Sequence, residues 1–110
     1  MPSAALPLIV LCNAPDQACA EQIAQICVER RLAACVNILA PCQSVYRWQG
    51  KVERATEIPL LIKTTEAAYP ALEALVRSLH PYEVPEIIAL CPATGLPAYL
   101  NWLATETDSL

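Results

Sequence analysis

Few side chains in this sequence have the types and spacing that catalysis needs. His80 is the only histidine, and the sequence offers it no identifiable nucleophile partner. Ser44 lacks the glycine-flanked turn that exposes a nucleophilic serine. With only Gly50 and Gly95, the chain has no glycine-rich loop for phosphates. We therefore expect a protein that is not an enzyme and that uses no organic cofactor.

The cysteines offer a second kind of chemistry, in disulfides or in metal binding. All six lie within apolar runs, and no two form a C-x-x-C pair. The apolar run that ends at Cys12 has no Lys or Arg before it, which is not typical of a signal peptide. In a chain without a secretory signal, reduced thiols that pack as small hydrophobic side chains are the expected state. We predict a cytoplasmic protein.

The charge balance limits the possible partners. The chain has a formal net charge of -4 and a pI near 4.8, and among its seven basic residues only Arg30 and Arg31 are adjacent. A nucleic-acid-binding face normally carries clustered Lys and Arg. No apolar run reaches the roughly 20 residues of a membrane span. We expect neither nucleic acid nor membrane as a partner.

The elements that must position any site are organised around a long hairpin. Two apolar, β-rich arms, 34–48 and 51–65, flank Gln49–Gly50, and Gly50 supplies the positive φ of a two-residue loop. This register puts Tyr46 and Trp48 on one face with charged partners. Strands usually hold roughly five or six residues, so these arms should overhang the domain and pair with another copy.

The apolar content also indicates association between copies. Hydrophobic residues make up 55% of the 110 residues and the mean hydropathy is +0.37. A chain of this size cannot bury so much apolar surface alone. We interpret the surplus as subunit interface.

The remaining segments predict strands and helices on both sides of the hairpin. The first strand is continuously apolar and is expected to be buried on both faces. The expected elements begin with a strand at 8–12 and a helix that is capped by Asn13 or Asp16 and closes near Leu32. The two arms follow, with a bend at Ala40–Pro41 and a bulge near Pro59. After them come a helix that ends at His80 and carries Leu72, Leu75, Val76 and Leu79 on one stripe, a strand at 86–91, a helix at 97–104 and a frayed tail.

This order is the split βαβ plan of ferredoxin-like domains. We predict an α+β fold, a βαββαβ antiparallel sheet with two helices on one face, a short C-terminal helix and the long central hairpin. In that plan the last strand lies antiparallel beside the first, so Cys12 and His80 can approach each other. We expect one domain over residues 1–110, with an ordered core from about 7 to 104.

Several motifs of the chain resemble, in order, those of the CutA family of divalent-cation tolerance proteins. They are IVLCNAP at 9–15, RLAACVNI at 31–38, SVYRWQGK at 44–51, Glu57 with IKT at 62–64, HPYEVPE at 80–86 and YLNWL at 99–103. The resemblance covers about residues 8–103. It implies a cytoplasmic, ferredoxin-like homotrimer, similar in architecture to PII signalling proteins and associated with tolerance to copper and other divalent cations.

The resemblance also implies a metal site. Copper-binding positions proposed in the family fall here on Cys12 and His80, but Leu79 stands where some members have a second histidine. A thiolate and an imidazole suit copper or zinc, although two ligands hold a metal poorly. Glu83 and Glu86 are close enough in the sequence to complete the shell, from this subunit or a neighbour.

Structural roles compete with these functional ones. His80 could simply cap a helix C-terminus, and Cys12 could be a buried core thiol. Glu57 and Lys63 could form a polar pair at an interface or contact a small molecule.

Three functions follow from these alternatives. The first is a metal-binding protein of metal tolerance and of the response to metal ions. The second is a PII-like trimeric signalling module that binds a small metabolite or a partner protein in clefts between subunits, where Tyr46 and Trp48 would either stack on the ligand or anchor the subunit contact. The third is a structural trimer without a ligand.

Overall fold

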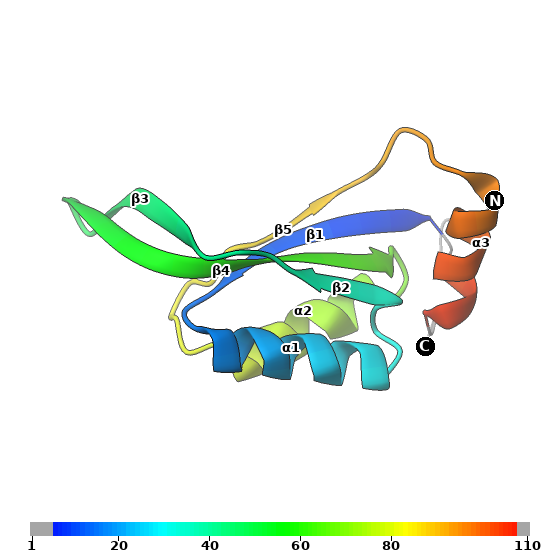
Figure 1. Cartoon of the computed structure of the whole chain (residues 1–110), viewed down its shortest axis with the longest axis horizontal. Helices are drawn as coiled ribbons and strands as arrows, with labels where there is room; N and C mark the ends of the chain where they lie inside the picture. The colour runs from blue at the N-terminus through cyan, green and yellow to red at the C-terminus, as the bar shows by residue number, and fades with distance from the viewer. Residues whose placement is uncertain (1–5, 108–110) are drawn as a thin grey trace.

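The structure, a computed structural model, describes residues 6–107, which form five strands and three helices (Figure 1). The elements are β1 (Pro7–Ala14), α1 (Gln17–Glu29), β2 (Cys35–Ile38), β3 (Cys42–Trp48), β4 (Lys51–Thr65), α2 (Tyr69–Leu79), β5 (Ile87–Leu90) and α3 (Pro97–Glu106).

The strands form one antiparallel sheet around the 15-residue strand β4. The strand order is β2-β4-β1-β5, and β3 pairs with the first half of β4, beyond the end of β2. β5 lies antiparallel beside β1, with Cys12 opposite Ile87. The predicted α+β fold with an antiparallel sheet is therefore confirmed.

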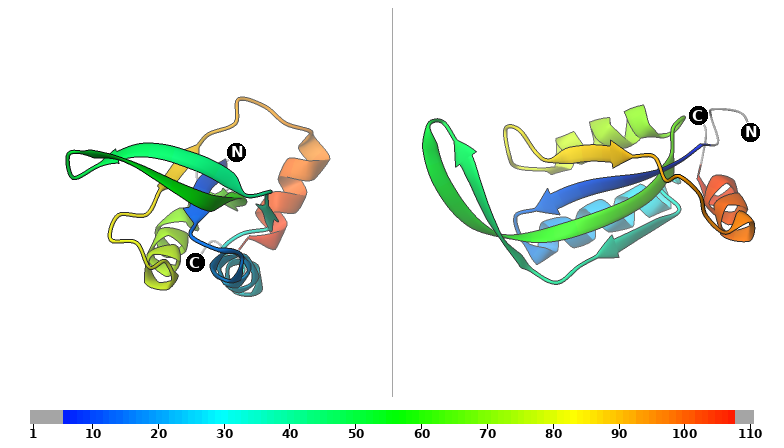
Figure 2. Two further views of the ribbon diagram at one scale, coloured as in Figure 1. Left: turned by 60° about the vertical axis from the view of Figure 1, so that its left-hand side comes forward. Right: turned by 90° about the horizontal axis from the view of Figure 1, so that it is seen from above.

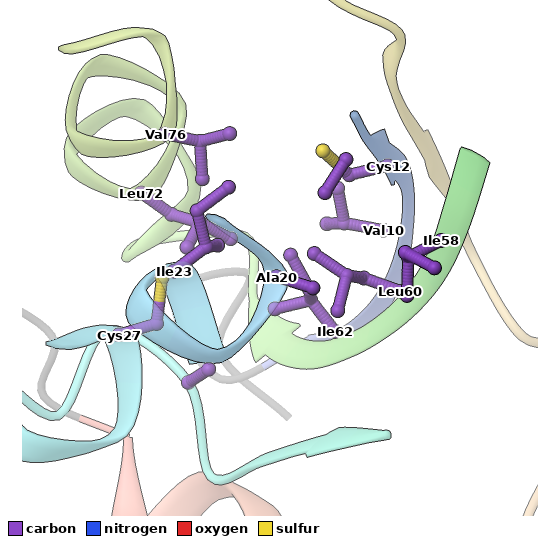
Figure 3. Close-up of a cluster of buried hydrophobic side chains, with 12 residues drawn as sticks. Val10, Cys12, Ala20, Ile23, Cys27, Ile58, Leu60, Ile62, Leu72 and Val76 are labelled. Atoms are coloured by element: carbon purple, nitrogen blue, oxygen red, sulfur yellow. The ribbon is translucent and has the colours of Figure 1, made fainter. Parts of the chain in front are cut away.

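Helices α1 and α2 cover one face of this sheet and enclose the hydrophobic core (Figures 1 and 3). Val10 of β1 and Leu60 of β4 meet Ile23 of α1 and Leu72 of α2, and all four are at most 1% exposed. Alternation along the strands puts these side chains on the helix side of the sheet. The amphipathic stripes predicted from the sequence thus form the core.

The opposite face of the sheet is only partly covered. In β1, Val10 and Cys12 are buried, whereas Ile9 and Leu11 are partly exposed. The expectation that this strand is buried on both faces is therefore wrong for the single chain, because the two large helices lie on one side of it. An apolar surface remains on the other side, and the exposed Ile88 of β5 is part of it.

The hairpin has the predicted register and loop. Trp48 pairs with Lys51, and the loop residues Gln49 and Gly50 have φ values of 50° and 80°. Both angles lie in the left-handed region that a two-residue loop requires. The tip of β3 and β4 extends beyond the rest of the molecule (Figures 1 and 2). With the hairpin included, the molecule measures 45 × 27 × 23 Å.

Pro59 lies inside β4 without interrupting it. Its register with β1 continues residue by residue, with Asn13 opposite Pro59. The irregularity is in the neighbouring strand, where the three residues 39–41 face two residues of β4. The predicted bulge is thus on the partner strand, at the bend between β2 and β3, so the N–H that proline lacks falls where the ladder is already interrupted.

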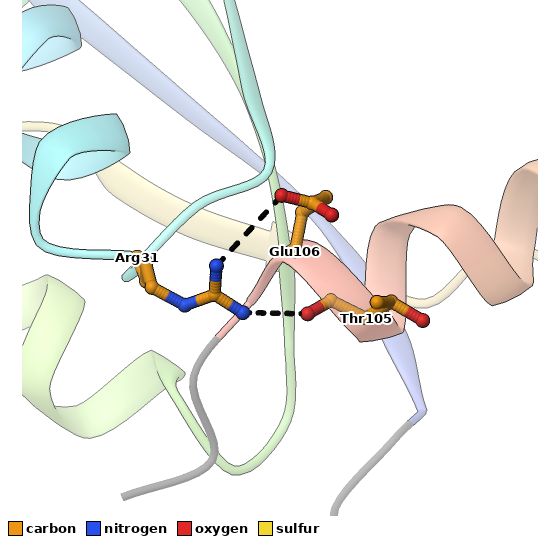
Figure 4. A network of polar contacts seen from close by, with 3 residues as sticks. All are labelled: Arg31, Thr105 and Glu106. Carbon is orange, nitrogen blue, oxygen red and sulfur yellow. Dashed lines mark hydrogen bonds and ion pairs between the residues drawn. The ribbon is translucent and has the colours of Figure 1, made fainter.

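The C-terminal helix is longer than predicted. α3 continues through Glu106, two residues past the expected end at Ala104. Arg31, at φ 57° after α1, donates from Nη2 to the carbonyl oxygen of Thr105 at 2.6 Å, and its Nη1 lies 3.7 Å from Oε1 of Glu106 (Figure 4). This contact from a distant segment stabilises the last turn, which local sequence patterns do not reveal. The rest of the expected tail, 108–110, lies outside the described residues. Within residues 6–107, no helix has the length and apolar content to cross a membrane.

Candidate functional site

A cleft of about 690 Å³ lies between the β3–β4 hairpin and the loop that connects α2 to β5. Its lining combines aromatic rings, carboxylates and aliphatic side chains. Its lining residues include Asn13, Tyr46, Trp48, Glu57, Tyr82 and Glu86. The hairpin overhang and the strand order bring these segments together, because the loop enters β5 beside β1.

Asn13, near the end of β1, connects the two walls of the cleft. Its Nδ2 donates to Oε1 of Glu57 at 3.4 Å and to Oε1 of Glu86 at 3.3 Å. Glu57 is in β4 and only 7% exposed, whereas Glu86 directly precedes β5. Two carboxylates from different segments thus converge on one amide. From the sequence, Asn13 is a candidate only for the cap of the first helix, although a polar residue at the end of an otherwise apolar strand is a signal of a site role.

His80 is held by both of its ring nitrogens. Nε2 lies 2.7 Å from the carbonyl oxygen of Asn13, and the backbone N–H of Tyr82 donates to Nδ1 at 3.2 Å. A carbonyl only accepts and a backbone N–H only donates, so these partners specify a neutral imidazole with its proton on Nε2. The backbone N–H of His80 also caps α2 by donating to Val76. The residue therefore has the predicted capping position, but its ring turns toward β1.

Cys12 is next to Asn13 but faces the opposite side of the sheet. Its side chain is 1% exposed and points into the core beneath the helices (Figure 3). Burial, followed by the negative charge of Glu86, raises the pKa of the thiol to about 12. The thiolate that metal binding requires is therefore strongly disfavoured at neutral pH.

The structure thus brings the two predicted metal ligands to one corner without forming a finished site. His80 bonds to Asn13, the neighbour of Cys12, as the predicted strand order led us to expect, and Glu86 also contacts Asn13. Among residues 6–107, no group of three or more His, Cys, Asp or Glu side chains is arranged to hold a metal ion. A metal at Cys12 and His80 would have to displace the thiol proton and one hydrogen bond of the imidazole. The assignment of Cys12 and His80 as ligands stays a prediction.

Aromatic residues line the cleft from both the hairpin and the opposite loop. Tyr46 and Trp48 of β3 are 42% and 40% exposed. Tyr82 lies with its ring centroid 4.7 Å from that of His80. Burial, and then the charge of and hydrogen bonding to Glu57, raise the pKa of the Tyr82 phenol. Tyr82 thereby contacts both the imidazole and the buried carboxylate; from the sequence we expect it either to pack or to line a cleft between subunits, and here it lines a cleft within one chain.

Comparison with known proteins agrees with the motifs of the sequence. Residues 8–106 match the family model described as CutA1 divalent ion tolerance protein. The chain belongs to the CutA1 family. The resemblance noted in the sequence is confirmed.

Relatives in this family come from bacteria and animals. The divalent-cation tolerance protein CutA of Thermus thermophilus is 50% identical over 99 residues, which are 90% of this chain and 96% of that relative. Protein CutA of Mus musculus is 47% identical over 96 residues, which are 87% of this chain but 54% of the mouse protein. The chain thus spans about half the length of that mammalian relative. These relatives are named as tolerance proteins or simply as CutA, and none of these names describes an enzyme.

Solved structures of CutA1 proteins have the same fold. The Thermus thermophilus divalent cation tolerance protein superimposes with a TM-score of 0.92 at 48% identity, covering 94% of this chain and all of the other. The Oryza sativa CutA1 structure also gives a TM-score of 0.92, at 38% identity and with 96% of each chain covered.

Proposed function

We propose that this CutA1-family chain binds divalent or soft transition metal ions, copper first among them and zinc second, and contributes to tolerance of these ions. The observation that carries the proposal is the corner at Asn13. The imidazole of His80 meets its carbonyl oxygen, two carboxylates meet its amide, and Cys12 precedes it. Thiolate, imidazole and carboxylate together can bind copper and zinc.

The state of these ligands limits the affinity. A metal must displace a proton from a thiol whose pKa is about 12, and it must compete with a buried hydrogen bond of His80. Both costs are subtracted from the free energy of binding. We therefore expect low to moderate affinity, which suits a role in metal tolerance better than a permanently loaded metal centre.

Calorimetric titration with Cu⁺ and Zn²⁺ tests this proposal. It is done without oxygen and with copper in the Cu⁺ state, because Cu²⁺ itself would oxidise the six free thiols to disulfides. Cys12→Ser and His80→Ala should each weaken copper binding by about tenfold or more, the effect of losing one of few ligands. Cys91→Ser, at an exposed cysteine, is the matched control and should bind as the wild type does. Unchanged binding in Cys12→Ser and His80→Ala would reject these two ligands.

We further propose a ferredoxin-like homotrimer in the cytoplasm. The strand order, with β5 and β4 on either side of β1 and two helices on one face, supports the ferredoxin-like plan. The exposed Ile88, Leu90 and Leu96, at 53%, 50% and 70%, support burial against other copies. Sedimentation equilibrium should give three times the chain mass of 12.0 kDa. A monomer at micromolar concentration would reject the trimer.

The alternative is a PII-like signalling module that binds a small metabolite or a partner protein in clefts between subunits. The cleft within one chain, of about 690 Å³, supports a small-molecule ligand, because small-molecule sites usually measure roughly 300–1,000 Å³. A thermal-shift screen of metabolites beside metal salts separates the two functions, since a ligand of the folded protein raises its melting temperature. Shifts with metabolites alone would favour the signalling module.

A further inference from the structure

The cleft beside Asn13 has features that a metal site does not need. One wall carries the half-exposed rings of Tyr46 and Trp48, and the opposite loop adds the aliphatic side chains of Val84 and Pro85. A hydrated metal ion gains nothing from aromatic and aliphatic contact. An organic ligand gains burial of its apolar part.

The charge of the cleft specifies the sign of the charge on that ligand. Glu57, Glu83 and Glu86 line it, and none of its lining residues within 6–107 is a lysine or arginine. Phosphates, nucleotides and carboxylic acids would be repelled. The cleft therefore favours a cation, and aromatic faces beside carboxylates are the usual surroundings of organic ammonium groups.

Glu57 is the strongest single indication that the ligand is a cation. It is only 7% exposed, and the ion pair found among residues 6–107 is the distant one of Arg31 with Glu106. The donors to this carboxylate are neutral: the amide of Asn13, at 3.4 Å, which it shares with Glu86, and the phenol of Tyr82. Two like charges held near one amide, one of them buried, are costly without a positive partner.

We propose that this cleft binds a linear diamine or polyamine. One terminal ammonium lies between Glu57 and Glu86, where its three N–H donors can be shared by both carboxylates. The methylene chain lies along Tyr46 and Trp48. The next ammonium lies toward Glu83, which is exposed at the rim. This site shares Glu57 and Glu86 with the corner proposed to bind metal, but it does not use the thiol of Cys12, which is on the other side of the sheet.

Calorimetric titration of the purified protein with spermidine and putrescine, at about 0.15 M salt to screen weak charge attraction, tests the proposal. We expect saturable binding of both amines and no binding of ATP. Glu57→Gln should weaken spermidine binding by about tenfold or more, the value of a hydrogen bond to a charged group. Trp48→Leu should weaken it about three- to tenfold through lost ring contact.

Glu66→Gln is the matched control. Glu66 directly follows β4, at the end away from the hairpin, is exposed and does not line the cleft, yet the substitution removes the same charge. It should change binding less than about twofold, as expected of a distant surface charge. Equal losses in Glu57→Gln and Glu66→Gln would show diffuse attraction to an acidic protein and would overturn the proposal.

Mg²⁺ tests whether the site recognises more than charge. If Mg²⁺ binds as tightly as putrescine, with the same dependence on Glu57, the cleft is a general cation site and the polyamine proposal is wrong. Thermal melting checks that Glu57→Gln is folded. If it is not, Trp48→Leu carries the test, because Trp48 is 40% exposed and outside the core, and unchanged spermidine binding in that variant would also overturn the proposal.

Discussion

The imidazole of His80 donates a hydrogen bond from Nε2 to the carbonyl oxygen of Asn13 over 2.7 Å. This bond connects the residue after α2 to the end of β1, 67 positions away in the sequence. Because Tyr82 donates its backbone N–H to the other ring nitrogen, one side chain sets the position of the loop that forms half of the cleft. His80 is thus a structural link between the core and the candidate site.

His80→Ala should therefore lower the free energy of unfolding by about 2–3 kcal/mol, because it leaves a buried carbonyl and a backbone N–H without partners. Urea denaturation measures the change. Ser78→Ala, two residues earlier, removes an exposed hydroxyl that bonds to Leu75 and should cost less than about 0.5 kcal/mol. Equal losses in the two variants would contradict the structural role of the imidazole.

The buried thiols predict a loss of stability in alkali. Burial raises the pKa of Cys12 to about 12 and that of Cys27 to about 11, from 9.0. Above about pH 9 the unfolded chain releases these protons while the folded chain keeps them, so the free energy of unfolding falls as the pH rises. Each thiol contributes at most about 1.4 kcal/mol per pH unit.

Urea denaturation at about pH 8, 9 and 10 measures this slope, to which the tyrosines, with an unfolded pKa of about 10, contribute equally in the wild type and in the cysteine variants. Cys12→Ala should have a shallower slope than the wild type, because one of the two shifted groups is gone. Cys91→Ala removes an exposed thiol and should retain the wild-type slope. If Cys12→Ala retains it too, the pKa of the Cys12 thiol is not raised in the folded protein, which contradicts its burial.

The parts of the fold that local rules control were predictable from the sequence. The Gln49–Gly50 loop and its register follow from one glycine between two β-rich arms, and α2 ends before Pro81. Local sequence could not decide whether Asn13 or Asp16 caps α1, because the answer depends on how far β1 pairs with β4. Pairing with β4 extends β1 through Ala14, so Asp16 is the first residue free to cap, and its carboxylate accepts the N–H of Cys19 at 2.8 Å.

The candidate site was predictable only as a neighbourhood. Strand order brings Cys12 and His80 to one end of the sheet, and the sequence supplied that order. Which way each side chain points depends on contacts between distant segments. Cys12 faces the helices because strand alternation and the packing of α1 and α2 require it, and His80 turns to Asn13 because that carbonyl lies at the end of β1.

The hairpin loop gives a test of backbone geometry. Gly50 has φ 80° and no atom within 4 Å of the position that a Cβ would take, so Gly50→Ala meets backbone strain without a steric clash. The variant should lose about 1–2 kcal/mol, the cost of a left-handed residue with a side chain. Gly50→Asn is the matched control and should lose less, because asparagine tolerates this region. Thermal melting followed by circular dichroism measures both, and an alanine variant as stable as wild type would contradict the assigned loop.

Arg31 contacts α3 through a hydrogen bond and an ion pair, and the two can be tested separately. The pair with Glu106 joins side chains that are 50% and 45% exposed, at 3.7 Å, so Glu106→Gln should cost less than about 0.5 kcal/mol. Arg31→Ala also loses the charged hydrogen bond to the carbonyl of Thr105 and should cost about 1–2 kcal/mol.

Alanine at position 31 has the same backbone limits as arginine at φ 57°, so the difference between these two variants reports on the side chain. Arg30→Ala, at the adjacent exposed position, controls for charge and should behave like Glu106→Gln. Urea denaturation gives the energies, and hydrogen exchange locates the effect. Faster exchange in the last turn of α3 should be confined to Arg31→Ala, because only that variant frees the carbonyl of Thr105. Equal exchange in all three variants would mean that packing, and not Arg31, holds the end of the helix.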